Sequence, residues 1–327
     1  MTSKINAAIF ILTQNTVERK VYLKTSLYFL FRNFNKKHNY PIIILHEDDY
    51  DKTSQQEIIM SVRKDHRHLI KFKQLDKEHF KVPEHIDKEK LKNCIDMQPV
   101  PYWRNLKYRM MCYFWVKHFF KYTEEYDYVM RLDDDSLIEE PLKDDLFQIC
   151  TQKDLVYMSN IVHIDCGICN YKMKDLFESI LPECKEQINS GLFVQASLKE
   201  GSIYFDRFKK MQTMIENKPC EVKEFITEMP IMYYNNFFVT STKFWKQQKV
   251  QDIINKIDED GGIFYYRYGD APIHTLIVTL LEPNKISRAQ FKYSKRLQRE
   301  VFIDNDNTMH SYMPSSYDNS SCITEGK

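Results

Sequence analysis

The chain has 327 residues, of which 43% are hydrophobic and 28% are charged, and its formal net charge at pH 7 is +1. This is the balance of an ordinary globular protein, and only 7 glycines and 11 prolines argue against collagen-like or low-complexity architecture. Because 47 basic residues are offset by 46 acidic ones, the charge does not support nucleic acid as the main partner.

No segment approaches the roughly 20 consecutive apolar residues that a membrane-spanning helix needs. We therefore expect a chain that is soluble as given, without a signal peptide or membrane anchor, and its compartment stays unknown. The eight cysteines do not suggest a disulfide framework in a chain of this length. Cys166 and Cys169 have the spacing of a metal or redox pair, but no second pair follows, so we interpret them as structural.

The first fifty residues predict a parallel βαβ unit. Residues 7–12 form an apolar run of strand length, which leads into a polar turn at residues 13–15. Residues 17–36 carry apolar side chains at helical intervals, and residues 40–45 form a second buried strand. A strand, a helix and a strand in this order are typical of nucleotide-binding α/β proteins.

The rest of the chain predicts further elements around the same sheet. The expected helices are 104–122, 141–150, 197–217 and 243–258, and the expected strands are 70–72, 126–131, 155–158 and 235–239. The basic segment 284–300 is interpreted as a surface insertion, and residues 315–327 as a flexible tail. Without an internal repeat or a clear linker, residues 1–314 are expected to form one domain.

Three consecutive aspartates, Asp133, Asp134 and Asp135, follow directly after a predicted strand. Ligands of open α/β sheets bind beyond the carboxyl ends of the strands. Side chains alternate along an extended segment, so Asp133 and Asp135 can point the same way while Asp134 points elsewhere. Two carboxylates on one side suit Mn²⁺ or Mg²⁺, which would stabilise a diphosphate leaving group. The alternative is an acidic turn or helix cap.

A second candidate site is the sequence GGIFYYRYGDAPIH at residues 261–274. Its glycines permit a close approach of the backbone, and Arg267 could hold a diphosphate or a carboxylate with two hydrogen bonds. Asp270 and His274 lie one helical turn apart if Pro272 stands in the first turn of a helix. The alternative for His274 is a hydrogen-bonded structural role.

The sequence GGIFYYRYGDAPIHT at residues 261–275 resembles the signature GGFFYERWGDAPVHS of the yeast α-1,2-mannosyltransferases, glycosyltransferase family 15. Other segments resemble motifs of that family and follow in the same order, so that the resemblance covers about residues 6–314. These segments are 34–41, YRMMC at 108–112, YVMRLDDD at 128–135, NF at 236–237 and 302–310.

The resemblance implies a GT-A fold, an α/β architecture with a mixed, mostly parallel central sheet flanked by helices. It also implies a GDP-mannose donor, a Mn²⁺ (or Mg²⁺) ion, a glycan or glycoprotein acceptor, and retention of the anomeric configuration. Carried over position by position, the metal ligands are Asp133, Asp135 and His310. The expected donor contacts are Asn15, Tyr108, Arg109, Asp133 and Asp135, and the candidate catalytic residues are Asn236, Arg267 and Asp270.

Three positions depart from the pattern of the family. Phe238 stands where the family has the glutamate proposed as nucleophile, and phenylalanine cannot form a glycosyl-enzyme intermediate. Gln14 replaces a donor-binding arginine expected after the first strand, and Tyr266 replaces the glutamate of the signature. The expected function is therefore a metal-dependent retaining hexosyltransferase whose acceptor attacks on the face that GDP leaves, with mannose as the expected hexose. The alternatives are an inactive relative that binds a nucleotide sugar or glycan, and a metal phosphoesterase or nuclease.

Overall fold

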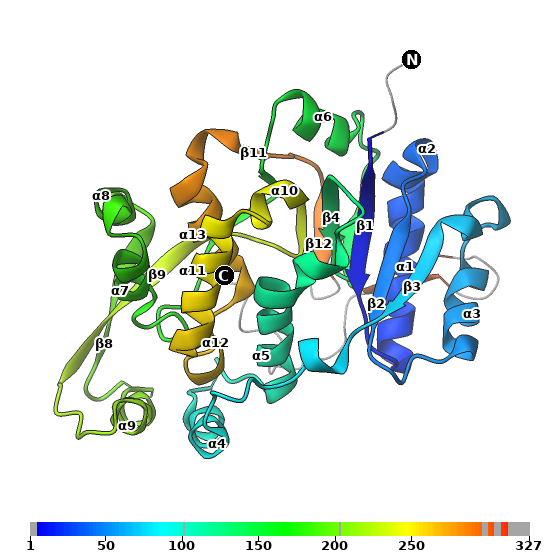
Figure 1. Cartoon of the computed structure of the whole chain (residues 1–327). Helices are drawn as coiled ribbons and strands as arrows, with labels where there is room; N and C mark the ends of the chain where they lie inside the picture. The colour runs from blue at the N-terminus through cyan, green and yellow to red at the C-terminus, as the bar shows by residue number, and fades with distance from the viewer. Residues whose placement is uncertain (1–4, 101, 203, 296–299, 304–308, 313–327) are drawn as a thin grey trace.

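The computed structural model describes residues 5–295 except 101 and 203, and the strands at 300–303 and 309–312. It is built around a seven-stranded sheet with the strand order β11-β6-β10-β4-β1-β2-β3 (Figure 1). These strands are β1 (Ala7–Leu12), β2 (Ile42–His46), β3 (Ile70–Gln74), β4 (Tyr128–Leu132), β6 (Tyr157–Ser159), β10 (Phe237–Ser241) and β11 (Ile286–Arg288). Within this sheet β10 alone runs antiparallel to its neighbours, so the expected mixed, mostly parallel sheet is confirmed.

Two helices of the structure begin beside residues that matter below. Thr16 caps the first helix by accepting a hydrogen bond from the backbone of Arg19, and Asn105 caps the fifth by accepting one from the backbone of Tyr108. The helices are α1 (Val17–Leu30), α2 (Lys36–His38), α3 (Lys52–Ser61), α4 (Lys88–Met97), α5 (Leu106–Tyr113), α6 (Leu146–Gln152), α7 (Met173–Ile180), α8 (Lys185–Asn189), α9 (Phe205–Glu216), α10 (Thr242–Trp245), α11 (Gln248–Asp260), α12 (Gly262–Tyr265) and α13 (Asp270–Leu281).

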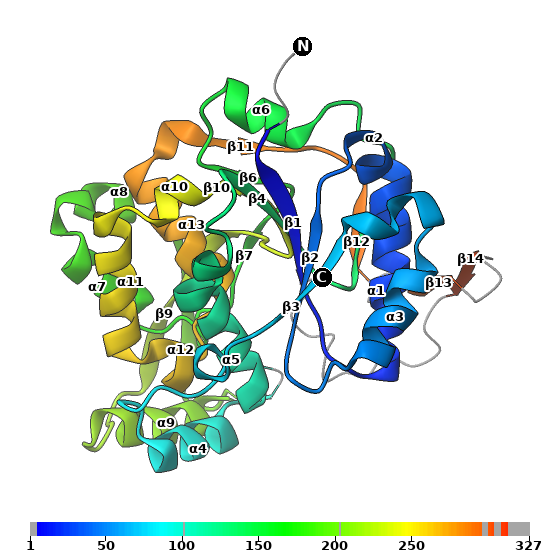
Figure 2. The ribbon, with the colours of Figure 1, turned by 45° about the vertical axis from the view of Figure 1, so that its right-hand side comes forward.

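Helices cover both faces of the sheet (Figures 1 and 2). The side chains of β1 alternate between these faces. Ile9 and Ile11 belong to a core shared with α1 and α3, whereas Ala8 and Phe10 belong to a core shared with α5, α11 and α13. Because both faces are buried, β1 is apolar at every position, as is typical of a strand within a parallel sheet.

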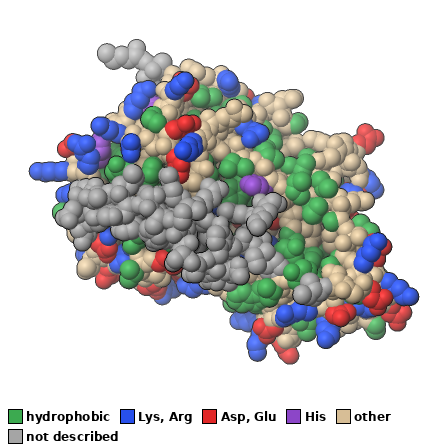
Figure 3. Space-filling view, turned by 180° about the vertical axis from the view of Figure 1, so that it is seen from behind, with side chains coloured by type: hydrophobic (Ala, Val, Ile, Leu, Met, Phe, Trp, Pro, Cys, Tyr) green, Lys and Arg blue, Asp and Glu red, His purple; other side chains and the backbone are tan. Residues whose placement is uncertain are grey.

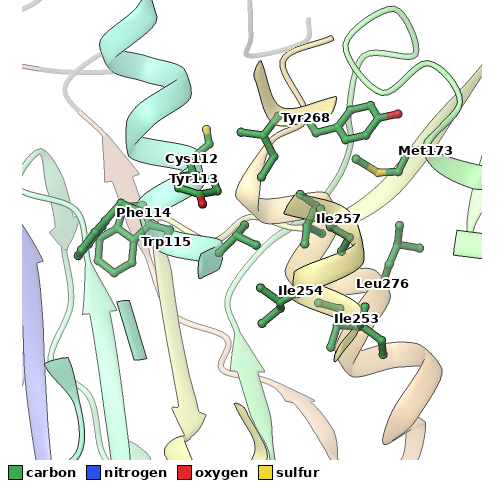
Figure 4. Close-up of a cluster of buried hydrophobic side chains, with 14 of the residues drawn as sticks. Cys112, Tyr113, Phe114, Trp115, Met173, Ile253, Ile254, Ile257, Tyr268 and Leu276 are labelled. Carbon is green, nitrogen blue, oxygen red and sulfur yellow. The ribbon is translucent and has the colours of Figure 1, made fainter. Parts of the chain in front are cut away.

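The second of these cores fixes the segments that will carry the functional site. Figure 4 shows a cluster of buried side chains that includes Phe114 and Trp115, which directly follow α5, isoleucines of α11, and Leu276 of α13. Phe114, Trp115 and Leu276 are almost completely buried. The apolar surface that they share places the first turn of α13 next to the end of β4, which is where Asp270 meets Arg131.

Most predicted elements are confirmed, with two differences. The helix expected at 197–217 covers only α9, because residues from 193 to 199 form β8 (Phe193–Lys199) instead. This strand pairs with β9 (Glu224–Tyr233), which in turn pairs with β7 (Val162–Ile164), in an antiparallel sheet that was not predicted. The exposed apolar side chains of these strands are Val162, Ile164, Val194 and Ile226, and the pairing of β8 with β9 places Val194 and Ile226 on opposite faces of the sheet. Figure 3 shows hydrophobic side chains gathered on one side of the molecule.

The segment 284–300, expected to be a surface insertion, contributes strands to the fold. Its strand β11 pairs in parallel with β6 and forms the edge of the central sheet. A second strand, β12 (Tyr293–Lys295), pairs with β5 (Ser136–Ile138) directly after the aspartate triplet. Two further strands, β13 (Glu300–Ile303) and β14 (Met309–Tyr312), form a hairpin, with β13 beside α1.

The tail expected at 315–327 lies outside the described residues. None of the helices that the structure describes is long and apolar enough to cross a bilayer.

Candidate active site

A cleft of about 560 Å³ opens at the carboxyl end of β4. Its walls come from the ends of β1, β4 and β9 and from the first turns of α5 and α13. The cleft therefore lies where an open α/β sheet is expected to bind its ligand. It brings together most of the predicted site residues, namely Tyr108, Asp133, Asp135, Asn236, Arg267 and Asp270.

The side chains of the aspartate triplet point in different directions, with Asp133 and Asp135 on one side, as predicted. Asp133 and Asp135 line the cleft, whereas Asp134 is buried and accepts hydrogen bonds from Thr13 at 2.8 Å and from Nε of Arg19 at 2.9 Å. Burial raises the pKa of Asp134, and the adjacent guanidinium of Arg19 opposes that rise. Asp134 thus anchors the loop to α1 and β1, which leaves its two neighbours facing the cleft.

The carboxylates of Asp133 and Asp135 both approach one cationic group. The Nζ atom of Lys295 lies 3.8 Å from Oδ2 of Asp133 and 3.5 Å from Oδ1 of Asp135. Lys295 reaches this point because β12 pairs with β5, the strand that follows the triplet. Within the described residues no group of three or more His, Cys, Asp or Glu side chains could hold a metal ion, so this pair of carboxylates is the candidate metal-binding feature.

A buried ion-pair network forms the floor of the cleft. Arg131 on β4 donates to Oδ1 of Asp133 at 2.9 Å and to Oδ2 of Asp270 at 2.5 Å, and its guanidinium lies 3.8 Å from the ring centroid of Trp115. Asn235 also donates to Oδ2 of Asp270, at 2.7 Å. Burial acts to raise the pKa of Asp270, but Arg131 and these hydrogen bonds outweigh it and hold the pKa below its ordinary value. Asp270 is therefore a fixed carboxylate that orients Arg131.

His274 has a structural role. Its Nε2 atom lies 3.2 Å from the backbone oxygen of Trp115, and its ring packs between Trp245 and Phe238 in the core. Burial lowers the pKa of His274 to about 4, so the imidazole is neutral at pH 7. The side chain does not line the cleft, and the structural alternative weighed for it is supported.

Arg267 is held on the cleft wall by a sulfur atom. Its Nη2 and Nε atoms lie 2.8 Å and 3.1 Å from Sγ of Cys169, and its guanidinium lies 5.4 Å from the ring centroid of Tyr108. The backbone of Arg267 has a φ of +82°, a left-handed conformation that residues other than glycine rarely adopt. The surrounding contacts therefore hold this side chain in one place.

Two residues expected to contact the donor are not in the cleft. Asn15 instead links the end of β1 to the start of α3, since it donates to the backbone oxygen of Asp49 and accepts from Ser54. Arg109 lies on the inward face of α5, where it is fully buried and donates to the backbone oxygen of Phe264 at 2.6 Å. Its position corrects the expectation, because the helix turns Tyr108 toward the cleft and Arg109 toward the core. The predicted ligand His310 belongs to β14, and its side chain lies outside the described part of the structure.

Position 238 faces the core. Phe238 is fully buried opposite Arg131 in the pairing of β10 with β4, with ring centroids 5.2 Å from Tyr157 and 5.8 Å from His274. It does not line the cleft. The acids that do line it include Asp165, whose Oδ2 accepts a hydrogen bond from Asn170 at 2.9 Å.

The sequence reasoning missed several residues of the site. The sequence did contain a signal for Arg131, because it is the only charged side chain within β4 and stands two residues before Asp133. No sequence pattern indicated three other residues, because each of them reaches the cleft through long-range packing; they are Arg19, Asp165 and Lys295. Asn235 precedes the predicted Asn236 and was overlooked beside it.

Comparison with known proteins identifies the family of the chain. The model of the family described as "Glycolipid 2-alpha-mannosyltransferase" matches residues 1–298. Glycolipid 2-alpha-mannosyltransferase 2 of Candida albicans is 25% identical over 256 residues, which make up 76% of this chain and 50% of that protein. The chain thus spans about half the length of such curated relatives.

Two solved structures share the fold. Core-mannan synthase A of Aspergillus fumigatus, solved in a form with Mn and GDP, matches with a TM-score of 0.70 and 21% identity over 89% of this chain and 75% of that one. The mannosyltransferase Ktr4p of S. cerevisiae, solved in complex with GDP, matches with a TM-score of 0.71 and 18% identity over 90% of this chain and 74% of that one. The expected glycosyltransferase architecture is thereby confirmed.

Proposed function

The chain belongs to the glycolipid 2-alpha-mannosyltransferase family, and from this premise we propose that it is a metal-dependent, retaining α-1,2-mannosyltransferase. It would transfer mannose from GDP-mannose to a sugar hydroxyl of a glycan or glycoconjugate. One observation carries the proposal: Asp133 and Asp135 converge on a single cationic point at the carboxyl end of β4, inside a cleft large enough for a ligand.

The two carboxylates at this point are suitable ligands for a divalent cation. Both carboxylates approach one nitrogen atom, that of Lys295, so both can also share one ion. Carboxylate oxygens are ligands that Mn²⁺ and Mg²⁺ accept, and His310 is the further ligand expected from the resemblance. When bound, the ion would stabilise the negative charge that develops on the diphosphate. The Mn- and GDP-containing form of core-mannan synthase A supports the choice of ion and nucleotide.

Side chains of the protein hold the aspartates of the site in a fixed orientation. Arg131 and Asn236 both donate to the carboxylate of Asp133, so its oxygens are fixed before a ligand arrives. Arg19 holds Asp134 and lies 3.5 Å from Oδ2 of Asp135, which keeps the loop in one arrangement. Such preorganised charges lower the barrier to reaction because they need not rearrange as charge develops.

The position of Phe238 bears on how the acceptor attacks. Position 238 offers no nucleophile, because a phenyl ring has no nucleophilic group and this ring is buried in the core. We therefore propose direct attack by the acceptor hydroxyl on the face that GDP leaves, without a glycosyl-enzyme intermediate. Arg267 and Asp270 would then shape the walls around donor and acceptor rather than form a covalent bond.

The absence of the family's glutamate also favours a second candidate, an inactive relative that binds a nucleotide sugar or glycan. Thermal-shift and calorimetric titrations with GDP and UDP, with and without Mn²⁺, test the binding step that both candidates share. A ligand at a hundredfold excess over its dissociation constant stabilises the native state by about 2.7 kcal/mol. We expect Mn²⁺-dependent stabilisation by GDP but not by UDP. No response to either nucleotide would overturn the transferase proposal and leave a relative that binds glycans.

A further inference from the structure

A pair of cysteines lies against the arginine on the cleft wall. Cys166 and Cys169 stand in the turn that follows β7, where the backbone nitrogen of Asn170 donates to the oxygens of Cys166 and Gly167. In such a helical turn, side chains three residues apart lie on the same side. Cys169 is buried and Cys166 is partly exposed, so the pair extends from the protein surface to the guanidinium of Arg267.

The surroundings shift the pKa values of the two thiols in opposite directions. Burial acts to raise the pKa of Cys169, but the thiol of Cys166 and the guanidinium of Arg267 outweigh it and lower that pKa to about 7. The pKa of Cys166 is raised well above its ordinary value, chiefly because its thiol donates to Cys169. One sulfur is therefore a stabilised thiolate beside a thiol that can later react with it.

Other buried cysteines of the chain lack this arrangement. Burial raises the pKa of Cys94 to about 11 and that of Cys150 to about 12. Burial also raises the pKa of Cys184, which is only partly exposed. Among these sulfur atoms, only Cys169 receives two hydrogen bonds from a guanidinium.

We propose that Cys166 and Cys169 form a redox-active dithiol that a hydroperoxide oxidises to a disulfide, with Arg267 as the positioning residue for the attacking thiolate. The thiolate of Cys169 attacks a peroxide oxygen, so that an S–O bond forms, the O–O bond breaks and hydroxide leaves as water after protonation. Cys166 then loses its proton and attacks the sulfur of the resulting sulfenic acid. The S–S bond forms, the S–O bond breaks and a second water is released. The two thiols are oxidised and hydrogen peroxide is reduced to two waters.

Oxidation changes a residue that lines the cleft. A disulfide sulfur carries no negative charge and is a weak hydrogen-bond acceptor, so Arg267 loses the partner that holds its strained backbone in place. The proposal does not depend on the mannosyltransferase assignment, because the dithiol chemistry requires only the contacts among these three side chains.

Peptide mapping tests the disulfide directly. The full chain is treated with hydrogen peroxide, its remaining thiols are alkylated and it is cut with trypsin, which yields a peptide of residues 154–172 that contains both cysteines and no other. We expect this peptide to lose two hydrogens and escape alkylation, in wild type and in the matched control Cys184→Ser. Two alkylated cysteines in that peptide, while Cys184 is oxidised at the same dose, would overturn the proposal.

The pH dependence of oxidation tests the role of Arg267. The rate in wild type should rise with pH through a midpoint near 7, and Arg267→Gln should shift the midpoint upward and slow the reaction at pH 7 about tenfold. Cys166→Ser keeps the contact between Arg267 and Cys169, so its sulfenic acid, trapped with dimedone, should form with a midpoint below 8 even if Arg267→Gln does not fold. A midpoint above 8 in both wild type and Cys166→Ser would exclude stabilisation of the thiolate by Arg267.

Discussion

The ammonium nitrogen of Lys295 lies 3.5 Å from Oδ1 of Asp135, and it is also 3.8 Å from Oδ2 of Asp133. A monovalent side-chain cation therefore occupies the point on which the two carboxylates converge. A divalent ion bound by both carboxylates has to displace this ammonium group, so Lys295 competes with the metal for the same charge. If the two carboxylates bind a metal ion, their affinity for it should therefore depend on Lys295.

Replacing this lysine should strengthen metal binding. In Lys295→Met the competing charge is removed while most of the aliphatic stem is kept, so we expect Mn²⁺ to bind several-fold more tightly in calorimetric titrations with GDP present. Lys292→Met is the matched control, because Lys292 pairs with Glu139 and its side chain is 68% exposed. If Lys295→Met binds Mn²⁺ more weakly than wild type, the ammonium group supports the site rather than competing for it.

The two carboxylates of the cleft should be required for metal-dependent binding. Asp135→Asn preserves the shape of the side chain but removes one of the two charges that face the shared point, so GDP should no longer stabilise the protein in the presence of Mn²⁺. The variant Asp144→Asn changes an exposed aspartate outside the cleft and should behave as wild type. Wild-type Mn²⁺ dependence in Asp135→Asn would remove this residue from the metal site.

The buried histidine should make stability depend on pH. The folded pKa of His274 is about 4, whereas an unfolded histidine has a pKa of about 6.5, so the unfolded state binds more protons between these values. Its contribution to stability is present above pH 6.5 and is lost as the pH falls toward 4, by about 2 kcal/mol between pH 7 and pH 5.

Urea unfolding at these two pH values measures this loss. The variant His274→Gln cannot take up the proton, so its free energy of unfolding should fall less than that of wild type over the same interval. His118, whose pKa burial also lowers to about 3, contributes to both proteins alike. An identical pH dependence in the two proteins would show that folding does not lower the pKa of His274.

Position 238 should matter for stability and not for turnover. Phe238→Leu truncates a fully buried ring that contacts Tyr157 and His274, so we expect a loss of about 1–2 kcal/mol in the free energy of unfolding. Turnover per folded molecule should stay within a few-fold of wild type, since the ring does not line the cleft. A hundredfold loss of turnover in a folded Phe238→Leu protein would place this residue in the active site after all.

The parts of the fold that follow from local patterns could be predicted. The apolar runs at residues 7–12 and 40–45 and the helical pattern between them predict a βαβ unit, and β1 indeed pairs in parallel with β2. The alternation expected of an extended segment predicted that Asp133 and Asp135 share one side, and the two side chains do line the cleft together, although the triplet forms a turn after β4. The prediction that Pro272 stands in the first turn of a helix, with Asp270 and His274 one turn apart, is confirmed by α13.

The rest of the site depends on contacts between distant segments. Arg131 and Asp270 are 139 residues apart and meet because two cores position β4 and α13. Lys295 reaches the triplet only through the pairing of β12 with β5, in a segment whose basic charge suggested a surface insertion. The sequence between 193 and 199 has helical neighbours, but pairing with β9 makes it a strand, since tertiary contacts override local propensity.

The site residues carried over from the family stay predictions, and the structure separates them into side chains that line the cleft and side chains that a helix turns toward the core. Tyr108 and Arg109 are adjacent in one motif, yet only Tyr108 lines the cleft, while the guanidinium of Arg109 supports the loop at Phe264. Burial lowers the pKa of Arg109 to about 10, which reflects its place in the core. A motif therefore identifies the helix but not the function of each of its residues.

Transfer of labelled mannose from GDP-mannose to methyl α-mannoside, followed with and without Mn²⁺, tests the proposed function most directly. The account predicts Mn²⁺-dependent transfer, loss of transfer in Asp135→Asn, and a product whose new bond keeps the α configuration by NMR. If GDP binds with Mn²⁺ but neither transfer nor donor hydrolysis occurs across a broad panel of nucleotide sugars and acceptors, the chain is a binding protein and the enzymatic proposal is contradicted.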